Sequence, residues 1–313
     1  MPKINKKTSK TIVWLTLILS VIYVLIIAPQ NTIIRVMSDT VDPYYWLVAK
    51  LVVVGVICLP FLVMGLNKVF AKKVRRDTFV SVVTSSVALI TAPLAVYASQ
   101  ASFASVMALS FPVIFVVLSA WLLREKLTHR TIAGVALAMI GALVIILIPF
   151  AVAHQGTVFY PMGILLSLVN GVSSALATIY MRRTHQAGVP LMASVGLNAW
   201  VAALVSLLLF VLLGDADKTP TGGTFVAAVL YSAIGVSILA RIVSVKLYEV
   251  TNSAFVGVIM YIQTFASIII PVLLLGEVLS LPIIIGGLLM LIAVYIIESH
   301  KTLHFQLHGW HHR

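Results

Sequence analysis

Apolar stretches of about twenty residues, separated by short polar segments, run through most of the chain. A helix of about 20 apolar residues is long enough to cross the hydrocarbon core of a bilayer. One such stretch could be a buried core helix, but ten of them predict an all-α membrane protein with ten transmembrane helices. The predicted spans are 11–34, 44–66, 79–98, 103–123, 132–148, 161–181, 190–213, 225–249, 253–275 and 282–297.

A hairpin between two spans occurs twice in the chain. Glu125 and Glu277 each stand in a Leu-Leu-x-Glu-x-Leu-Thr/Ser corner, and Gly134 and Gly286 follow at the same distance. Such self-similarity indicates an internal duplication. Because each half has an odd number of spans, the two halves must lie upside down relative to each other, as in many secondary transporters. The predicted units are 1–150 and 151–299, two inverted five-helix repeats, and 300–313, a His-rich cytoplasmic tail.

Lys and Arg residues gather in the loops on one side of the predicted membrane. With the N-terminus placed inside, the only basic residues outside are Arg35 and Lys218, which lie among acidic residues. This bias predicts a multi-pass protein of the cell membrane with both termini in the cytoplasm. Basic loops also account for the net charge of +12 without nucleic acid as a partner.

Composition agrees with the membrane prediction. The chain is 61% apolar and 10% charged, whereas soluble domains carry about 25% charged residues. Cys58 is the only cysteine, so an internal disulfide is impossible.

The two five-helix repeats, their shared corner and the Gly-bearing last helix of each resemble the EamA-type transporters of the drug/metabolite transporter superfamily. Pro112, thirteen residues before Glu125, fits the family pattern. The second repeat departs from it, with Thr264 at the matching position and its proline at Pro271. The basic residue early in the second helix, usually Arg in the family, is Lys50 here. The resemblance implies a site between the halves, with helices five and ten standing apart as support.

Three cations fall inside the predicted spans, where charged side chains are costly and therefore candidates for function. Lys246 is interpreted as interfacial, which leaves Lys50 and Arg241. Lys50 either faces a central cavity or extends to the headgroups. Arg241 faces a cavity if its helix continues to Glu249, and lies at the surface if the helix ends at Ala240. The only acidic residue in any span is Glu249, so we expect the substrate to carry a carboxylate or phosphate group.

Uncharged residues within the spans complete the predicted substrate site. Gln263 has Ser267 one turn later on the same face, and a buried amide needs hydrogen-bond partners. Bonds between helices are the alternative use of such side chains. These uncharged candidates are Asn170, Asn198, Tyr261, Gln263 and Thr264.

Glu125 and Glu277 are expected to lie at opposite membrane faces, so we interpret both as structural, capping or pairing at their turns. The five histidines after residue 299 have no spacing of a defined metal cage. No motif of a metalloprotease, nucleophile elbow or phosphate-binding loop occurs. No catalytic residue, metal or cofactor is therefore predicted.

The predicted function is secondary active transport of a small organic metabolite by alternating access, with an anionic solute favoured. A proton-coupled multidrug or metabolite exporter of neutral or cationic compounds is the alternative. An intramembrane enzyme or lipid-processing protein is the alternative from another class. The expected partners are the small-molecule substrate and membrane lipids, with a homodimer left open.

Overall fold

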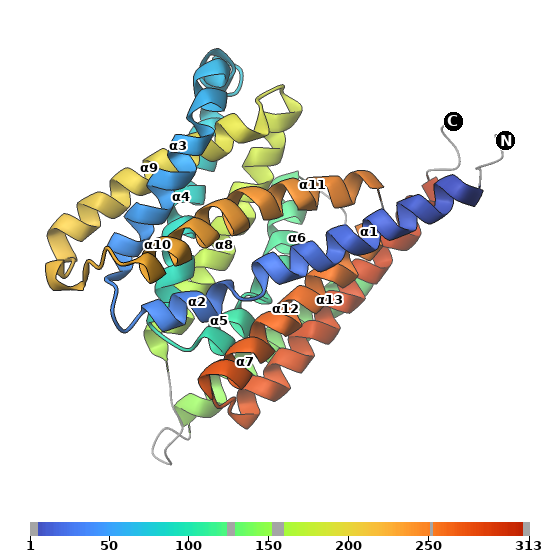
Figure 1. Ribbon diagram of the computed structural model, residues 1–313. Helices are drawn as coiled ribbons and strands as arrows, with labels where there is room; N and C mark the ends of the chain where they lie inside the picture. The colour runs from blue at the N-terminus through green and yellow to red at the C-terminus, as the bar shows by residue number, and fades with distance from the viewer. Residues whose placement is uncertain (1–5, 124–128, 152–159, 251–252, 309–313) are drawn as a thin grey trace.

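The computed structural model describes residues 6–123, 129–151, 160–250 and 253–308. All regular secondary structure in these residues is helical (Figure 1). The first half of the chain contains α1 (Lys6–Ile27), α2 (Gln30–Met37), α3 (Pro43–Val69), α4 (Arg75–Tyr97), α5 (Ala101–Met107), α6 (Ser110–Leu123) and α7 (His129–Ala151).

The second half repeats this arrangement with one irregular segment. A π-helix, η3 (Tyr231–Leu239), stands between two α-helices, and together they form one continuous helical stretch. The elements are α8 (Pro161–Gln186), α9 (Leu191–Leu213), the 3-10 turn η2 (Ala216–Lys218), α10 (Gly223–Leu230), η3, α11 (Ala240–Val250), α12 (Ser253–Leu275) and α13 (Leu281–His308).

Seven of the described helical stretches are long and apolar enough to cross a membrane, and the rest of the apolar helices are shorter. The seven are Trp14–Met37, Pro43–Val69, Arg75–Tyr97, Ala101–Leu122, Pro161–Gln186, Leu191–Leu213 and Gly223–Ser244. The shorter apolar helices are Ile132–Ile145, Ile262–Leu275 and Leu281–Ala293.

Two predicted spans are broken, and the last one is longer than expected. The first span divides into α1 and α2 at Pro29, which has no backbone N–H to continue the helix. The fourth divides into α5 and α6 after Met107. The last helix, α13, continues to His308, beyond the predicted end at residue 297, so most of the predicted tail is helical.

Residues of the other half satisfy polar groups at the break after α1. The carbonyl oxygen of Ile26 accepts a hydrogen bond from the Tyr231 hydroxyl at the start of η3. The neighbouring Ser232 Oγ donates to Gln30 Oε1 over 2.7 Å. The break in α1 and the π-helix therefore support each other across the two repeats.

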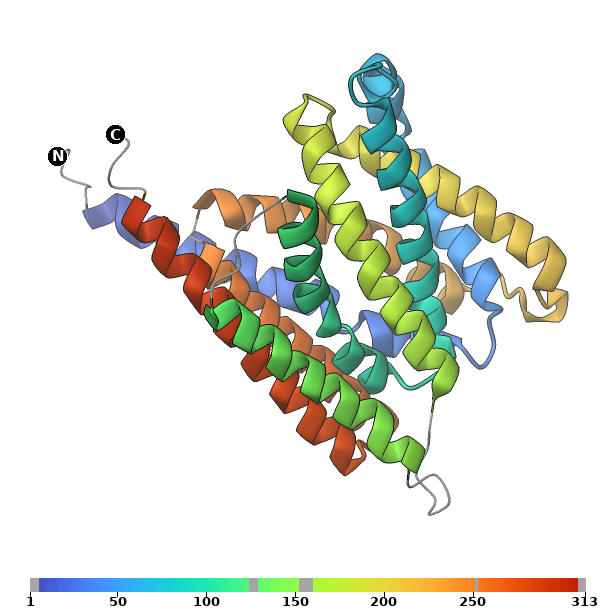
Figure 2. The same cartoon turned by 180° about the vertical axis from the view of Figure 1, so that it is seen from behind.

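Glycines allow helices of the two halves to pack closely. At Gly55 of α3, the indole of Trp200 from α9 lies against the backbone, and its Nε1 donates to the Gly55 carbonyl over 3.1 Å. A Cβ atom on Gly141 of α7 would lie 2.7 Å from the Gly286 carbonyl oxygen of α13. Figure 2 shows α7 and α13 side by side along most of their length.

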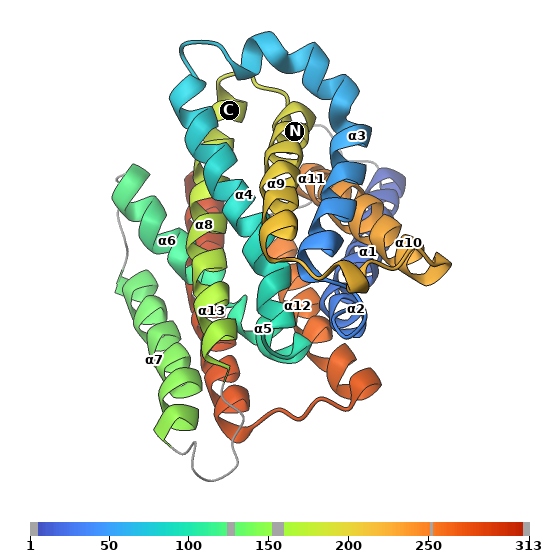
Figure 3. The ribbon, with the colours of Figure 1, turned by 90° about the vertical axis from the view of Figure 1, so that its left-hand side faces the viewer.

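The bundle has two ends, which differ in the loops that they carry. One end, here called the Glu277 end, carries the α2–α3 turn, the α4–α5 turn and the α12–α13 loop, and it lies at the bottom of Figure 3. The opposite end carries the α3–α4 and α8–α9 turns. The basic side chains of Lys68, Lys72, Lys73, Arg75, Arg76, Arg182 and Arg183 belong to this opposite end.

Candidate functional site

Lys50 lies on α3, about two turns from the start of that helix. Asp42 fixes this start, because its Oδ1 accepts from the backbone N–H groups of Tyr44 and Tyr45 over 2.8 and 2.9 Å, with Pro43 as the first helical residue. The side chain of Lys50 is only 8% exposed. Among the residues that the structure describes, it forms no hydrogen bond or ion pair. A buried cation is thus held at a defined position on a capped helix.

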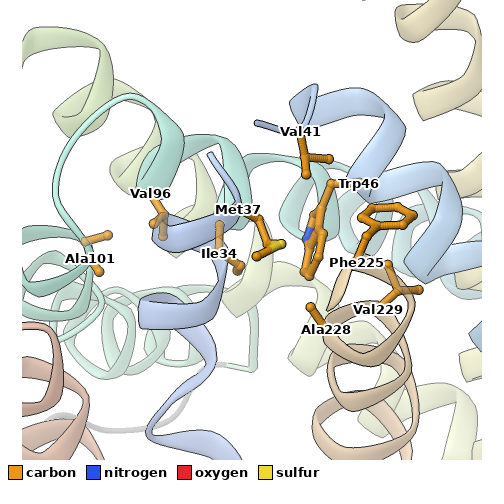
Figure 4. Close-up of a cluster of buried hydrophobic side chains, with 10 residues drawn as sticks. Ile34, Met37, Val41, Trp46, Val96, Ala101, Phe225, Ala228 and Val229 are labelled. Atoms are coloured by element: carbon orange, nitrogen blue, oxygen red, sulfur yellow. The ribbon is translucent and has the colours of Figure 1, made fainter. Parts of the chain in front are cut away.

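Trp46 lies one turn before Lys50 on the same face of α3. It is fully buried, in a cluster with Met37 of α2 and Phe225 of α10. Figure 4 shows its indole between these two side chains. The indole Nε1 has no hydrogen-bond partner in the described part of the chain. Tyr97 of α4 packs against the same cluster, and its hydroxyl likewise has no partner there.

Lys50, Trp46 and Tyr97, here called the Lys50 site, present an ammonium, an indole N–H and a phenol O–H. Buried polar groups are normally hydrogen-bonded, so the indole N–H of Trp46 and the hydroxyl of Tyr97, which have no partner in the described residues, are candidates to bind a ligand or water. These two groups and the Lys50 ammonium can all donate a hydrogen bond. The sequence pattern singled out Lys50 but not Trp46 or Tyr97, since aromatic residues in spans usually serve packing.

Two asparagines of the predicted site lie on helices of the second half. Asn198 is buried on α9, the helix that packs against α3, and its amide has no partner among the described residues. Asn170 is half-buried on α8, and its Nδ2 donates to the Ala88 carbonyl of α4 over 2.8 Å. Asn170 thus forms the bond between helices that was the alternative interpretation of its amide.

Gln263 belongs to a polar network that crosses from α12 to the first half. Its Nε2 donates to Ser267 Oγ over 2.9 Å, one turn along the same helix, so the amide has a partner within α12. Ser105 of α5 donates to the Ser267 carbonyl over 3.1 Å, and Asn31 Nδ2 donates to Ser105 Oγ over 2.8 Å. Asn31 and Ser105 were not predicted, although Asn31 stands out as an amide in an apolar span.

The remaining predicted residues lie away from the Lys50 site or are only partly described. Arg241 lies on α11, inside a continuous helical stretch that extends to Val250, and its side chain is exposed on the surface of the isolated chain. Thr264 is half-buried on α12. Tyr261 also lies on α12, and its side chain is outside the described part of the structure.

Glu277 has a structural role, as predicted, but it caps a helix of the other half. Its Oε1 accepts from the Ala101 backbone N–H over 2.9 Å. Its Oε2 accepts from the N–H and the hydroxyl of Ser102 over 2.8 and 2.5 Å. The carboxylate therefore holds the start of α5. Glu125, the matching residue of the first half, lies outside the described residues.

A protein-family comparison matches both repeats to the EamA-like transporter family, over residues 14–147 and 161–299. The chain belongs to the EamA-like transporter family. It is therefore a multi-pass membrane protein of a transporter family. The two matched segments correspond to the two helical halves and meet near the connection between α7 and α8.

A solved structure titled "Crystal structure of protein" has the same fold. It aligns with a TM-score of 0.60 over 93% of this chain and 98% of that chain, at 17% sequence identity. At this identity the likeness shows a shared fold and says nothing of a substrate. No curated protein matches the chain.

Proposed function

We propose that this EamA-family chain is a secondary active transporter of a small organic solute that carries a carboxylate or phosphate group. Its ten spans form two inverted five-helix repeats, and alternating access exposes a site between them to each side in turn. The basic loops of the opposite end lie in the cytoplasm with both termini, and the Glu277 end faces outward.

The observation that supports this proposal is that Lys50 is buried without a hydrogen-bond or ion-pair partner in the described residues. Placing a lysine inside a membrane helix costs up to roughly 3 kcal/mol on insertion scales, the full cost applying at the helix centre. The described residues offer Lys50 no carboxylate or other acceptor to offset that cost. An anionic solute would do so, and the donors of Trp46 and Tyr97 would bind its remaining oxygens.

The other predicted residues differ in how directly they would contact the solute. Asn198 is free to contact the solute beside α3, while Gln263 acts through its network with Ser267. Asn170 positions α8 against α4 rather than binding directly. Thr264, Tyr261 and Arg241 complete the proposed pathway along α12 and α11.

The test is ligand binding by purified protein, without any need for flux. A panel of small carboxylates, phosphate esters, neutral solutes and cationic drugs is screened for stabilisation against heat, and affinities of the hits are then measured. We expect anionic solutes to bind, and Lys50→Gln to weaken them about 10- to 100-fold, because a hydrogen bond to a charged group contributes about 1.5–3 kcal/mol. Lys50→Arg should retain most of the affinity.

Lys68→Gln is the matched control, since Lys68 is an exposed lysine near the end of the same helix. Its affinity should equal that of the wild type. If the hits are neutral or cationic and Lys50→Gln binds them normally, the anionic proposal is wrong and the multidrug exporter takes its place.

A further inference from the structure

Helix α5 is a short, wholly buried element between the two halves at the Glu277 end. All seven of its residues are buried, and Ala101, Ser102 and Met107 have no exposed surface. Its first turn has backbone N–H groups with no partner within the helix. Glu277, from the loop after α12, supplies the acceptors for two of them. A carboxylate of the second repeat thus determines where a helix of the first repeat begins.

The contacts of Glu277 are strong for a single side chain. Three hydrogen bonds converge on one carboxylate, and bonds to an ionised acceptor are about twice as strong as neutral ones. Glu277 also lines a pocket of about 430 Å³ with Arg35 of α2, Asp39 from the turn after α2 and Gln100 before α5. Arg35 bonds to Ser38 Oγ and forms no ion pair with Glu277 in the described residues. In the described residues, all hydrogen bonds of this carboxylate therefore go to the start of α5.

A second set of bonds lies deeper on the same helix. Ser105, one turn after Ala101, joins Asn31 of α2 to Ser267 of α12. These groups belong to both repeats, so α5 is fastened to the second half at two successive levels. Separation of the repeats at this end requires the Glu277 bonds to break, together with the Ser105 bonds and those of Asp42 to Asp215 and Lys218.

We infer that Glu277 is a latch that holds the transporter closed at the Glu277 end. The inference rests on the proposed function, since a latch has meaning only if the two ends open in turn. A contact made in one state alone shifts a two-state equilibrium by its own free energy. Weakening the latch should therefore favour the state that is open at the Glu277 end and closed at the opposite end.

The test uses two reporter cysteines in protein whose single native cysteine is removed by Cys58→Ala. Ser105→Cys reports from behind the latch, and Ser81→Cys reports from the first turns of α4 at the opposite end; both positions are buried. Because Ser105→Cys itself removes the bonds to Asn31 and Ser267, each latch variant is compared with the parent that carries the same reporter. The rate of maleimide labelling is measured in lipid nanodiscs for each reporter. Glu277→Gln should raise labelling at position 105 about tenfold or more, because it replaces a charged acceptor. It should lower labelling at position 81.

Two further variants calibrate the effect. Ser102→Ala removes one of the three bonds, so its effect at position 105 should have the same sign and be smaller. Asp217→Asn changes an exposed carboxylate at the same end and should alter neither rate. If Glu277→Gln leaves position 105 unchanged, or raises both rates together as general loosening would, the latch is wrong. Flux of the wild type, measured in parallel, tests the transporter function separately.

Discussion

Two tryptophans on the packed pair α3 and α9 use their indole nitrogens differently. Trp200 Nε1 donates to the Gly55 carbonyl, whereas Trp46 Nε1 is buried without a partner among the described residues. The first bond fastens two helices. The second donor, one turn from Lys50, is the one that the proposed function assigns to the solute. We therefore assign a structural role to the Trp200 nitrogen and propose a binding role for the Trp46 nitrogen.

Replacing each tryptophan by phenylalanine should separate these roles. Trp46→Phe and Trp200→Phe remove similar volume, so their packing losses are comparable. Trp200→Phe should lose an additional 1 kcal/mol, roughly, because it leaves the Gly55 carbonyl without its donor. Trp46→Phe should lose solute affinity instead. Thermal unfolding and binding of the same ligand measure both effects, and equal affinities in the two variants would remove Trp46 from the site.

Only part of the residue-scale arrangement could be predicted from the sequence. Spacing along one helix predicted that Gln263 and Ser267 share a face, because they are four residues apart. The hydrogen bond between them is visible only in the structure. No local pattern joins Glu277 to Ala101, since their contact depends on how two repeats pack. Lys50 was identifiable as a charge in an apolar span, but the lack of a partner is visible only in three dimensions.

At the scale of elements, glycines determine how closely α7 and α13 approach. A Cβ on Gly141 would lie 2.7 Å from the Gly286 carbonyl oxygen, and a Cβ on Gly286 would lie 2.4 Å from Ile145. The Gly286 carbonyl oxygen belongs to the backbone, so no side-chain rotation can move it aside. The pair of helices therefore depends on both glycines.

Gly141→Ala should destabilise the protein by about 1–3 kcal/mol, the usual cost of overpacking. The loss should appear in thermal unfolding, while ligand affinity stays unchanged, because α7 lies outside the Lys50 site. Gly222→Ala is the control: a Cβ there meets nothing within 4 Å, and its φ of −65° suits alanine. Equal stability of Gly141→Ala and wild type would show that the helices can separate without cost.

Hydropathy predicted the helices well, because the bilayer sets their length and apolar character. The predicted bounds of α12, 253–275, agree with the structure. The breaks inside spans were missed. Prolines give a local reason for both: Pro29 lies at the first break, and Pro112 cannot donate to the Ala108 carbonyl at the second. The π-helix from Tyr231 has no signature in the apolar pattern, since contacts with Ile26 and Gln30 of the other half support it.

At the scale of the whole molecule, the two repeats meet around the Lys50 site, and their ends differ in charge. Acidic residues and the Glu277 bonds lie at one end, and most basic loops lie at the other. Under the proposed function, alternating access connects these features, because it would expose a solute bound near Lys50 first to one end and then to the other.

Counterflow in proteoliposomes tests this account most directly. Vesicles loaded with the best anionic ligand are diluted into a trace of the same labelled ligand. Wild-type protein should accumulate label transiently above equilibrium, because exchange through one site couples the opposing fluxes. Lys50→Gln should show little accumulation, and Lys68→Gln should match the wild type. Tight binding of the ligand by wild-type protein, with no accumulation of label, would contradict transport as the function.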